Sequence, residues 1–567
     1  MLSLKRLLAI LMVTLLLGIV YFSYTLNESR VKQVELKNNI PAEEVFLKNE
    51  SWDVTEQTKY LLVGEKSTVR DNAETLLATQ KLPYKVREKL EQEDLTRGNI
   101  LIFCTDTLED CVDVRLLEAY LTRGGKMILA SGIAEGYADS YLLPVLGIVE
   151  KSTRENYNTF SVSPGFLPFS EKKMTYSGYC MSTWISLRED ADIYMADIES
   201  QVPIVYSYPH GMGKSVVINA SFLEDMSCMG ILSGAIGIAT EEYIYPVMGT
   251  ECVFLDHFPI VTYINDGVST KLYGRTTESF VRDELWPVFQ RIAMQNQIRY
   301  TSSVLVAAPE GIYFPETNRG LLYTMGKSAM QFEGEVILAA DLPESRKYDY
   351  NTAFFQGFRE TFTNYRINAL AITSGRPDPE VLKSLKKEVG DIRVLRSSIQ
   401  GGNKEFVAGF SMEEGYYTCP VLSDQISLDD GNIFAISSGL AAYGAVSQQF
   451  DVDEFIATSQ ETSNWDEYSK ELGDYDTRVF EKTGWLDRYT ISEMENRIRS
   501  YSGLSYGWYQ EGSDVVLKST NCQVGQPFFF RTDRTIISAQ GAEYQKISEG
   551  YYMIRIREPE VRIQLTK

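Results

Sequence analysis

The sequence predicts a multidomain α/β protein with an N-terminal transmembrane helix, a doubly wound domain, a β/α barrel and a C-terminal β-sandwich. Three observations predict this class. An uncharged apolar run stands at 7–26, strand-like and helix-like segments alternate from about 59 to 460, and the hydrophobic period becomes two after about 505. Alternating strands and helices favour parallel sheets, whereas short strands separated by turns favour sandwiches. The 567 residues suffice for three or four domains of about 100–200 residues each.

The apolar run 7–26 is long enough to cross a bilayer as one helix. Lys5 and Arg6 precede it, so the positive-inside rule places the N-terminus in the cytoplasm and the C-terminal bulk outside the cell. No small-residue cleavage site follows the run, which favours an uncleaved signal-anchor over a cleaved signal peptide. The polar segment 27–58 would then be a stalk. We therefore expect a single-pass protein of the cell membrane.

Composition narrows the classes of function. The formal net charge of −22 disfavours nucleic acid as a partner, because its phosphates would be repelled. Only two histidines occur, His210 and His257, so an imidazole-rich metal site cannot be built. The 7 cysteines include no CxxC pair, and we expect them to be scattered small apolar residues rather than parts of a zinc ribbon.

The segment 59–245 predicts the doubly wound domain. Apolar runs such as KYLLV and NILIF have the pattern of buried strands, and amphipathic segments lie between them. Residues 195–222 predict a hairpin whose turn is PHGMGK. Its GMGKS lacks the first glycine and the strand-to-helix context of a phosphate loop, so we interpret it as a tight turn. Ser131 follows the strand KMILA but lacks the GxSxG frame, so we expect no catalytic triad.

On this strand order and on the hairpin PIVYSYPHGMGKSVVINAS, the segment 59–245 resembles the glutamine-amidotransferase-like domains that accompany many sugar-active proteins. Active members carry a nucleophilic cysteine, which the segment ILASGIAEGY lacks. The resemblance therefore implies a non-catalytic module.

The segment 251–460 predicts the β/α barrel, because strand–helix units repeat along it. In such barrels the chemistry lies at the C-terminal ends of the strands. Six residues stand at strand ends of this kind: Asp256, His257, Asp266, Asp341, Ser374 and Arg376. Residues 461–504 are expected to form a helical connector, and the period-two segment 505–567 the β-sandwich.

The segment FLDHFP, residues 254–259, is the sharpest candidate site. A strand-end carboxylate can act as a general base, and its neighbour can help to hold a divalent metal ion that activates water. Asp256 takes the base position, and His257 together with Asp256 would hold the metal. The alternative match is YINDG, residues 263–267, with Asp266 as the ligand. Asn265 then stands in the base position, where it cannot accept a proton.

With these motifs the chain resembles the polysaccharide deacetylase (NodB-like) barrel. More closely, it resembles a family of membrane-anchored bacterial proteins found beside Pel-type exopolysaccharide genes, in which an FLDDFP-like segment precedes a helix with a WWP-like motif. FLDHFP and ELWPVF, residues 284–289, match those motifs. The resemblance implies polysaccharide as a partner, with Trp286 and Arg376 as substrate-binding residues. It also implies membrane exopolysaccharide synthase subunits as further partners.

The chain departs from active deacetylases in its histidines. Their HxxxH pair is absent from GEVILAADLPESRK, where Asp341 has the nearest place. Where a late histidine would act as general acid, SQQFDVDEF offers instead Gln448, Gln449, Asp451 and Asp453. We therefore expect a degenerate barrel that binds polysaccharide and needs no cofactor. One divalent metal ion, held by His257 and carboxylates, is the alternative.

Two other functions stay open. One is an active enzyme, either a divergent deacetylase or a glycosidase, with Asp256, Asp266 and Asp341 as its acids. The other is a purely structural scaffold for a membrane synthase, which would lack an acidic cleft at the strand ends.

Overall fold

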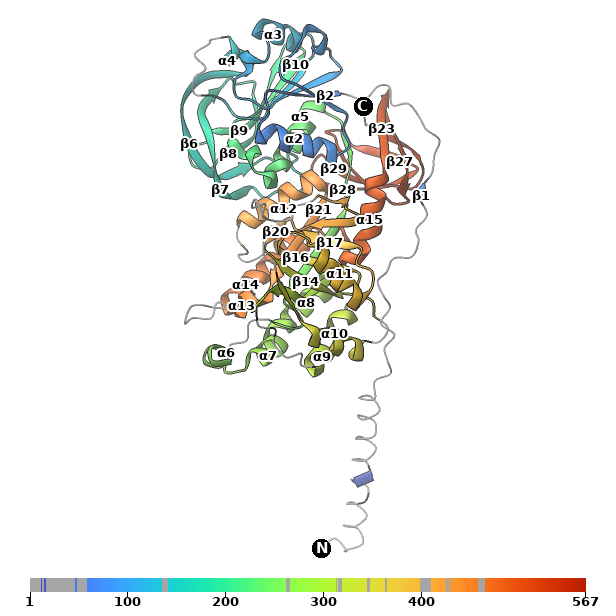
Figure 1. Cartoon of the computed structure of the whole chain (residues 1–567). Coiled ribbons are helices and arrows are strands. Elements are labelled where there is room, and N and C mark those ends of the chain that lie inside the picture. Colours follow the sequence, from blue (N-terminus) through green and yellow to red (C-terminus); the bar gives the residue numbers. More distant parts are fainter. Residues whose placement is uncertain are drawn as a thin grey trace, which may run out of the picture.

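The computed structural model describes residues 59–134, 141–261, 266–312, 314, 319–343, 347–362, 365–397, 409–424, 428, 430–456 and 465–566, together with Met12, Leu15, Leu16 and strand β1 (Phe46–Leu47). The described chain forms an α/β domain, a barrel below it and a sandwich beside both (Figure 1). The expected membrane span at 7–26 and the stalk at 27–58 lie almost wholly outside the described residues. Within the described part, no helix has the length and apolarity to cross a membrane.

The first domain is built on one mixed sheet with the strand order β3-β2-β4-β5-β10-β9-β8-β6-β7. Its parallel half consists of β2 (Lys59–Val63), β3 (Tyr84–Arg87), β4 (Asn99–Phe103), β5 (Lys126–Leu129) and β10 (Gly213–Ile218). Side chains of α2 (Thr68–Thr79) and α5 (Met229–Thr240) pack into the core on one face, and those of α3 (Val114–Thr122) and α4 (Leu142–Val145) into the core on the other. The predicted doubly wound arrangement is confirmed.

The antiparallel half of this sheet consists of β9 (Pro203–His210), β8 (Asp192–Asp197), β6 (Ile148–Val162) and β7 (Lys173–Leu187). The predicted hairpin is confirmed as β9 and β10, and Gly211 supplies the left-handed conformation of its turn with a φ of 64°. The long strands β6 and β7 were not expected. Repeated register shifts between them break the period-two pattern that would have indicated them.

The second domain is a closed parallel β/α barrel. Strands β12, β13, β14, β16, β17 and β19 follow one another, and β21 lies on the other side of β12. Residues 416–424 pair with β17 through β19 and with β21 through β20, which closes the ring. The bounds are β12 (Thr250–Asp256), β13 (Tyr300–Pro309), β14 (Glu335–Leu342), β16 (Ala369–Gly375), β17 (Val394–Ser397), β19 (Tyr416–Pro420), β20 (Ser423–Asp424) and β21 (Ala445–Asp451).

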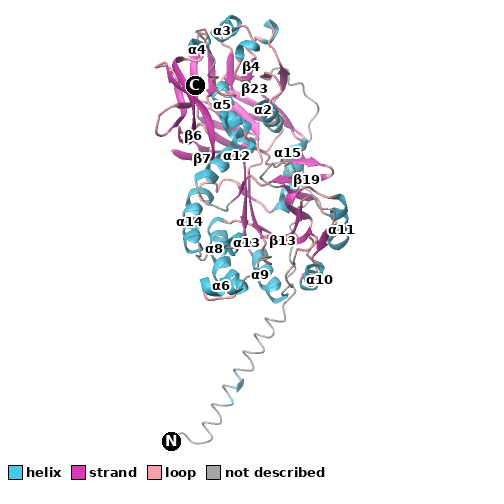
Figure 2. Cartoon of the chain, turned by 60° about the vertical axis from the view of Figure 1, so that its left-hand side comes forward, coloured by secondary structure: helices cyan, strands magenta, loops and turns pink. Residues whose placement is uncertain are grey.

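Helices enclose the barrel strands (Figure 2). The sequence indicates several of them: Asp378 accepts hydrogen bonds from the first amides of α11, and Pro379 stands in its first turn. The bounds are α6 (Asp266–Tyr273), α7 (Thr277–Phe280), η5 (Val281–Leu285), α8 (Trp286–Asn296), α9 (Arg319–Gln331), α10 (Thr352–Thr361), α11 (Pro379–Val389), α12 (Asp430–Tyr443) and α13 (Val452–Ile456). Short strands β15 (Tyr348–Tyr350) and β18 (Ser411–Glu413) flank the ring.

Helix α15 closes the base of the barrel. It follows α14 (Trp465–Tyr475), η6 (Asp476–Phe480) and β22 (Asp487–Arg488), and it spans Ile491–Gly503. Its Ile491, Met494 and Ile498 pack with barrel residues such as Cys252 and Phe254 in one core. The segment 465–504, where a helical connector is expected, thus contains helices α14, η6 and α15 and the short strand β22, and α15 seals the N-terminal mouth of the barrel.

The third body is a two-sheet sandwich, as the period-two pattern predicts. One sheet has the order β23-β24-β30-β27, with the bounds Ser505–Glu511, Asp514–Thr520, Glu560–Leu565 and Ile536–Gln540. The other has the order β11-β26-β29-β28, with the bounds Tyr243–Pro246, Pro527–Arg531, Tyr551–Ile556 and Ala542–Ser548. Strand β25 (Cys522–Gln523) pairs with β1. Strand β11 comes from the chain before the barrel, so the sandwich is not built from the C-terminal residues alone.

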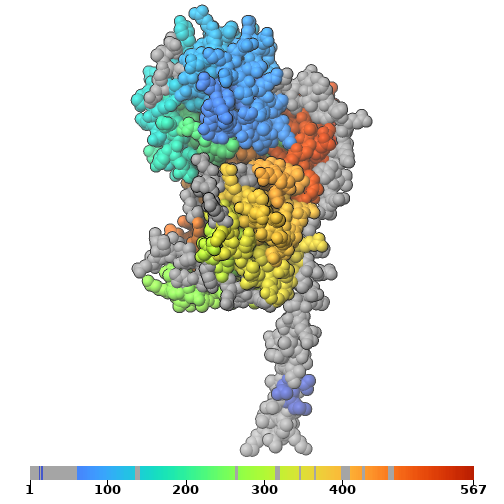
Figure 3. All heavy atoms as spheres, in the orientation of Figure 1, coloured from blue at the N-terminus to red at the C-terminus, as the bar shows by residue number. Residues whose placement is uncertain are grey.

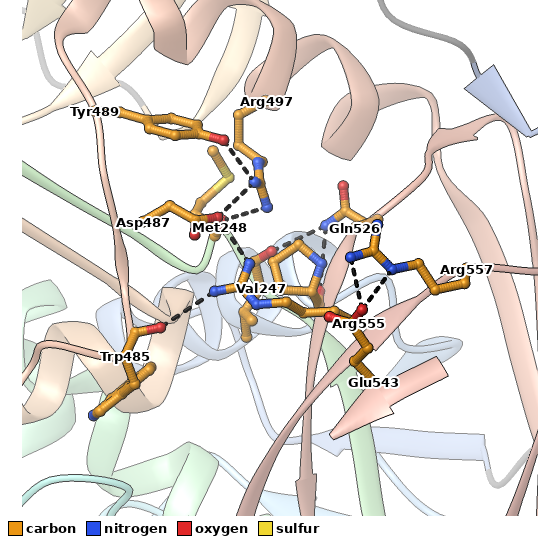
Figure 4. A network of polar contacts seen from close by, with 11 residues as sticks. Val247, Met248, Trp485, Asp487, Tyr489, Arg497, Gln526, Glu543, Arg555 and Arg557 are labelled. Carbon is orange, nitrogen blue, oxygen red and sulfur yellow. Dashed lines mark hydrogen bonds and ion pairs between the residues drawn. The ribbon is translucent and has the colours of Figure 1, made fainter. Parts of the chain in front are cut away.

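Hydrogen bonds and ion pairs join the three bodies, which lie against one another in Figure 3. Gly230 of α5 donates its amide hydrogen to Ser438 of α12 at 3.0 Å, which links the first domain to the barrel. Asp487 accepts from Arg497 of α15 at 2.9 Å and from Arg555 of β29 at 2.8 Å (Figure 4). One carboxylate thus ties the base of the barrel to the sandwich.

All the cysteines of the chain, Cys104 to Cys522, are buried and unpaired. Burial is the main cause that raises the pKa of the Cys104 thiol and that of the Cys180 thiol to about 12. These thiols therefore stay protonated and unreactive, which agrees with the expectation of scattered apolar residues.

Candidate functional site

The candidate site lies where the barrel strands β12 and β21 end, beside the middle of β13. Asp256 is the last residue of β12, and it is in register with Ser303 on β13 and with Asp451 on β21. His257 follows in the left-handed backbone region, with a φ of 55°. Strand pairing therefore brings together the FLDHFP motif and the FDVDEF segment.

Asp256 is held in a buried ion pair with Arg396 of β17. Arg396 Nη1 lies 2.5 Å from Oδ1 and Nη2 lies 2.6 Å from Oδ2, while Ser303 Oγ donates to Oδ1 at 2.7 Å. Each of the paired side chains is 1% exposed. Burial acts to raise the pKa of Asp256, but the charge and hydrogen bonds of Arg396, aided by His257, outweigh it and hold the pKa below its ordinary value. Asp256 is thus an ionised carboxylate at neutral pH.

His257 forms a second charged group beside the first. Its Nδ1 lies 2.7 Å from Asp451 Oδ1 and 3.6 Å from Asp453 Oδ2. Burial acts to lower the pKa of His257, but the hydrogen bond to Asp451 and the charges of Asp451, Asp453 and Asp256 raise it to about 9. The ring is therefore an imidazolium at neutral pH, and Nδ1 donates to Asp451. Asp451 Oδ1 also accepts from the Asp453 amide at 2.9 Å.

The described residues do not fit the divalent metal ion that a deacetylase barrel implies. Among them, no group of three His, Cys, Asp or Glu side chains is placed to hold a metal ion. His257 Nδ1 is engaged by the Asp451 carboxylate at 2.7 Å. Arg396 occupies both oxygens of Asp256.

The other expected acids lie apart from this pair. Asp341 of β14 accepts a hydrogen bond from Ser374 Oγ of β16, and both side chains are half-buried at their strand ends. Asp266 begins α6, is exposed, and accepts from the Thr277 amide at 2.8 Å. Asn265, of the alternative motif, lies outside the described residues.

The two expected substrate-binding residues have different positions. Arg376 is exposed just beyond the end of β16. Trp286 is 2% exposed, its ring centroid lies 4.6 Å from that of Phe258, and its Nε1 donates to Ser328 Oγ at 3.0 Å. Trp286 is thus a packing residue behind the FLDHFP motif, and its position gives no support to a substrate contact.

Arg396 and Ser303 were not expected in the site. Arg396 stands in the run VLRS, whose neighbours are buried strand residues. A charge within a buried strand requires a partner, and this was the signal available in the sequence. Its partner Asp256 lies 140 positions away, on a strand that is not adjacent to β17, so no local pattern indicates the pairing.

Fold and site together define a multidomain α/β protein with a parallel β/α barrel and a buried charge cluster at the ends of its strands. The structure is similar to the crystal structure of Agd3, a carbohydrate deacetylase, with a TM-score of 0.51 and 10% sequence identity, over 90% of this chain and 99% of that one. The chain belongs to the family described as "Uncharacterised protein conserved in bacteria (DUF2194)", which matches residues 21–323. A comparison with curated protein sequences gave no match.

Smaller parts of the chain are similar to glycosidases. A β-galactosidase from Bacillus circulans sp. alkalophilus matches with a TM-score of 0.24 and 11% identity, over 32% of this chain and 31% of that one. The exo-β-1,4-mannosidase Op5Man5 from Opitutaceae bacterium strain TAV5 matches with a TM-score of 0.23 and 17% identity, over 33% and 36%.

Proposed function

We propose that this protein binds polysaccharide through a non-catalytic, deacetylase-like barrel and takes part in exopolysaccharide biosynthesis or modification. An N-terminal signal-anchor would hold it in the cell membrane with its folded bulk outside, where it would meet polysaccharide and the membrane synthase subunits. The barrel fold shared with a carbohydrate deacetylase supports the class of ligand.

The observation that carries this proposal is that the Asp256 carboxylate is buried and fully hydrogen-bonded within the protein. A general base must come within hydrogen-bond reach of the proton that it removes. Asp256 is 1% exposed and already accepts from both terminal nitrogens of Arg396 and from Ser303. With three donors on its two oxygens, this carboxylate stabilises a buried cation instead of facing a substrate.

His257 supports the same proposal. An imidazolium paired with Asp451 cannot act as a base, and it cannot ligate a metal until it loses its proton. The site thus keeps the shape of a strand-end active site, while its charges neutralise one another.

One observation favours a second candidate, an active divergent hydrolase. Asp256 and His257 are consecutive residues that bear a carboxylate and a protonated imidazole, which is the pairing that acid–base catalysis uses. For this candidate, Asp256 would have to gain access to the substrate, and the half-buried Asp341 would be the second carboxylate.

Acetate release separates the two candidates. The full chain in detergent micelles would be incubated with N-acetylhexosamine oligomers and added divalent metal ions, beside Asp256→Asn and Asp341→Asn. We expect binding of the oligomers without acetate release above that of the Asp256→Asn variant. Metal-dependent release that Asp256→Asn abolishes, in a variant that circular dichroism shows to be folded, would overturn the non-catalytic proposal in favour of the second.

A further inference from the structure

A cavity of about 270 Å³ lies in the first domain, far along the chain from the barrel site. Residues that follow β2, β4, β5 and β10 line it, among them Ser67, Asp106, Ser131 and Asn219. In the strand order β3-β2-β4, the chain leaves β2 to one side and returns on the other, so the sheet has its topological switch point between β2 and β4. Open α/β sheets bind ligands at this point, beyond the C-terminal ends of their strands.

Three buried polar atoms, each in a residue that lines this cavity, have no hydrogen-bond partner among the described residues. They are Ser131 Oγ, Ser182 Oγ and Asn219 Oδ1. Ser182 is 2% exposed and Asn219 is 0% exposed. The Asn219 amide is fixed, because its Nδ2 donates to the carbonyls of Thr183 at 2.7 Å and Pro203 at 3.1 Å. Buried polar atoms are normally hydrogen-bonded, so these three side chains are the ones in the lining that a ligand could satisfy.

The charges around the cavity favour a neutral ligand. Arg154 is the cation on the wall, and its Nη2 lies 3.1 Å from Asp106 and 2.9 Å from the Ile133 carbonyl. Glu224 adds a second carboxylate to the wall. The N-terminus of α2 is capped by Ser67, which accepts from the Arg70 amide, so part of its hydrogen-bonding capacity is already used. An anionic ligand would therefore meet more negative than positive charge.

The wall is suited to binding and not to chemistry. None of its described residues is a histidine, and Cys104, the thiol among them, is kept protonated by burial. The volume of the cavity lies just below the range of about 300–1,000 Å³ that is typical of pockets for drug-sized ligands, so one small ring would fill it.

We propose that this cavity is a second binding site, separate from the barrel, and that it takes one neutral sugar ring, free or at the end of a glycan. The ring hydroxyls would exchange hydrogen bonds with Ser131 and Ser182 and would donate to Asn219. The site does not depend on the activity or inactivity of the barrel.

Two substitutions test the proposal. Ser131→Ala and Ser182→Ala each remove a hydroxyl that has no partner among the described residues, so neither should lower the unfolding temperature. Each should raise the Kd for the sugar about two- to tenfold, because one hydrogen bond to the ligand is lost. Ser302→Ala is the matched control, since its Oγ is also buried and unpartnered but lies in the barrel on β13. This control should leave the Kd unchanged.

Titration calorimetry and saturation-transfer NMR on the full chain in micelles would measure the binding. The probes are glucose, galactose and N-acetylglucosamine, a short N-acetylglucosamine oligomer, and glucuronate and L-glutamine as charged comparisons. We expect binding of a neutral sugar that weakens in both cavity variants, and the oligomer separates a free ring from a chain end. No neutral-sugar binding, a preference for glucuronate or glutamine, or binding that both variants leave intact would overturn the proposal. Because Asp256→Asn leaves the cavity untouched, failure here is distinguishable from failure of the barrel proposal.

Discussion

At the residue scale, the paired charges inside the barrel determine what the site can do. Asp256 and Arg396 are each 1% exposed, so water does not solvate their charges, and each charge is compensated by the other. Such a pair adds little stability compared with apolar residues, but breaking it leaves a charge without compensation. The same pairing that closes Asp256 to substrate therefore makes the loss of either partner destabilising.

Replacing Arg396 by Met should lower the free energy of unfolding by about 3–5 kcal/mol, because Asp256 is left as a buried unpaired carboxylate. Chemical denaturation measures this change. Arg359→Met is the matched control: it removes an exposed pair with Glu388 and should cost less than about 1 kcal/mol. The double variant Asp256→Asn with Arg396→Met should recover part of the loss. A loss below about 1 kcal/mol in Arg396→Met would contradict the structural role given to the pair.

The protonation of His257 predicts a pH-dependent stability. Its pKa is raised from 6.5 to about 9 in the folded state, so the folded protein holds this proton more tightly. The resulting stabilisation is complete below about pH 6.5 and is lost as the pH rises through about 9. The wild type should thus exceed His257→Gln in free energy of unfolding at pH 6, at about 1.4 kcal/mol per unit of pKa shift, and the excess should shrink by pH 9.5. The same difference in free energy of unfolding between the wild type and His257→Gln at pH 6 and at pH 9.5 would refute this prediction.

Part of the site could be predicted at this scale. Asp256, His257, Asp451 and Asp453 stand at the ends of apolar runs, where residue type and position are visible in the sequence. The charge pairing with Arg396 depends on strands that are not adjacent, and the burial of Trp286 depends on how α8 packs. Neither follows from a local pattern.

At the element scale, the barrel base shows how a buried helix end is satisfied. The first amides of α15 donate to barrel side chains, Ile491 to Thr301 Oγ1 at 3.1 Å and Ser492 to Glu335 Oε1 at 3.0 Å. Helix N-termini need such acceptors when water is excluded. Burial is the main cause that raises the pKa of Glu335 to about 7.

Glu335→Gln should therefore change the pH dependence of stability. Between about pH 4.5 and 7, folded Glu335 keeps a proton that the unfolded chain has lost, so the stability of the wild type falls as the pH rises. Gln keeps an oxygen acceptor for Ser492 but cannot ionise. The variant should gain stability relative to the wild type between pH 4.5 and pH 7.5, as measured by denaturation at both values. A constant difference between the two proteins would show that Glu335 does not titrate in this way.

Helices and strands with a clear local sequence pattern could be predicted, and those without one could not. The hairpin of β9 and β10 has apolar runs around a glycine turn, and α11 has its capping Asp378 and Pro379. Strands β6 and β7 have mixed faces and shifted registers, so no period indicates them. Strand β11 is too short to indicate, from its sequence alone, which sheet it joins.

At the scale of the whole molecule, close helix packing joins the first domain to the barrel. A Cβ atom at Gly230 of α5 would lie 2.3 Å from the Ser438 carbonyl oxygen of α12. Only glycine therefore permits this approach.

Gly230→Leu should force α5 and α12 apart and lower the free energy of unfolding by at least about 1–3 kcal/mol. Thermal unfolding followed by circular dichroism would detect it. Gly473→Leu in α14 is the matched control, because a Cβ there meets nothing within 4 Å, and it should be neutral or slightly stabilising. Equal melting temperatures for the two variants would mean that the helix contact contributes little.

Strand β11 has a consequence for how the chain is made and how it can evolve. The ribosome delivers this strand long before its neighbour β26, so its edge stays open while the barrel is translated. A product that stops before residue 527 never covers that edge and is exposed to aggregation and to proteolytic quality control. For the same reason, the terminal module cannot be lost or exchanged as a cassette during gene rearrangement, because one of its strands is encoded upstream of the barrel.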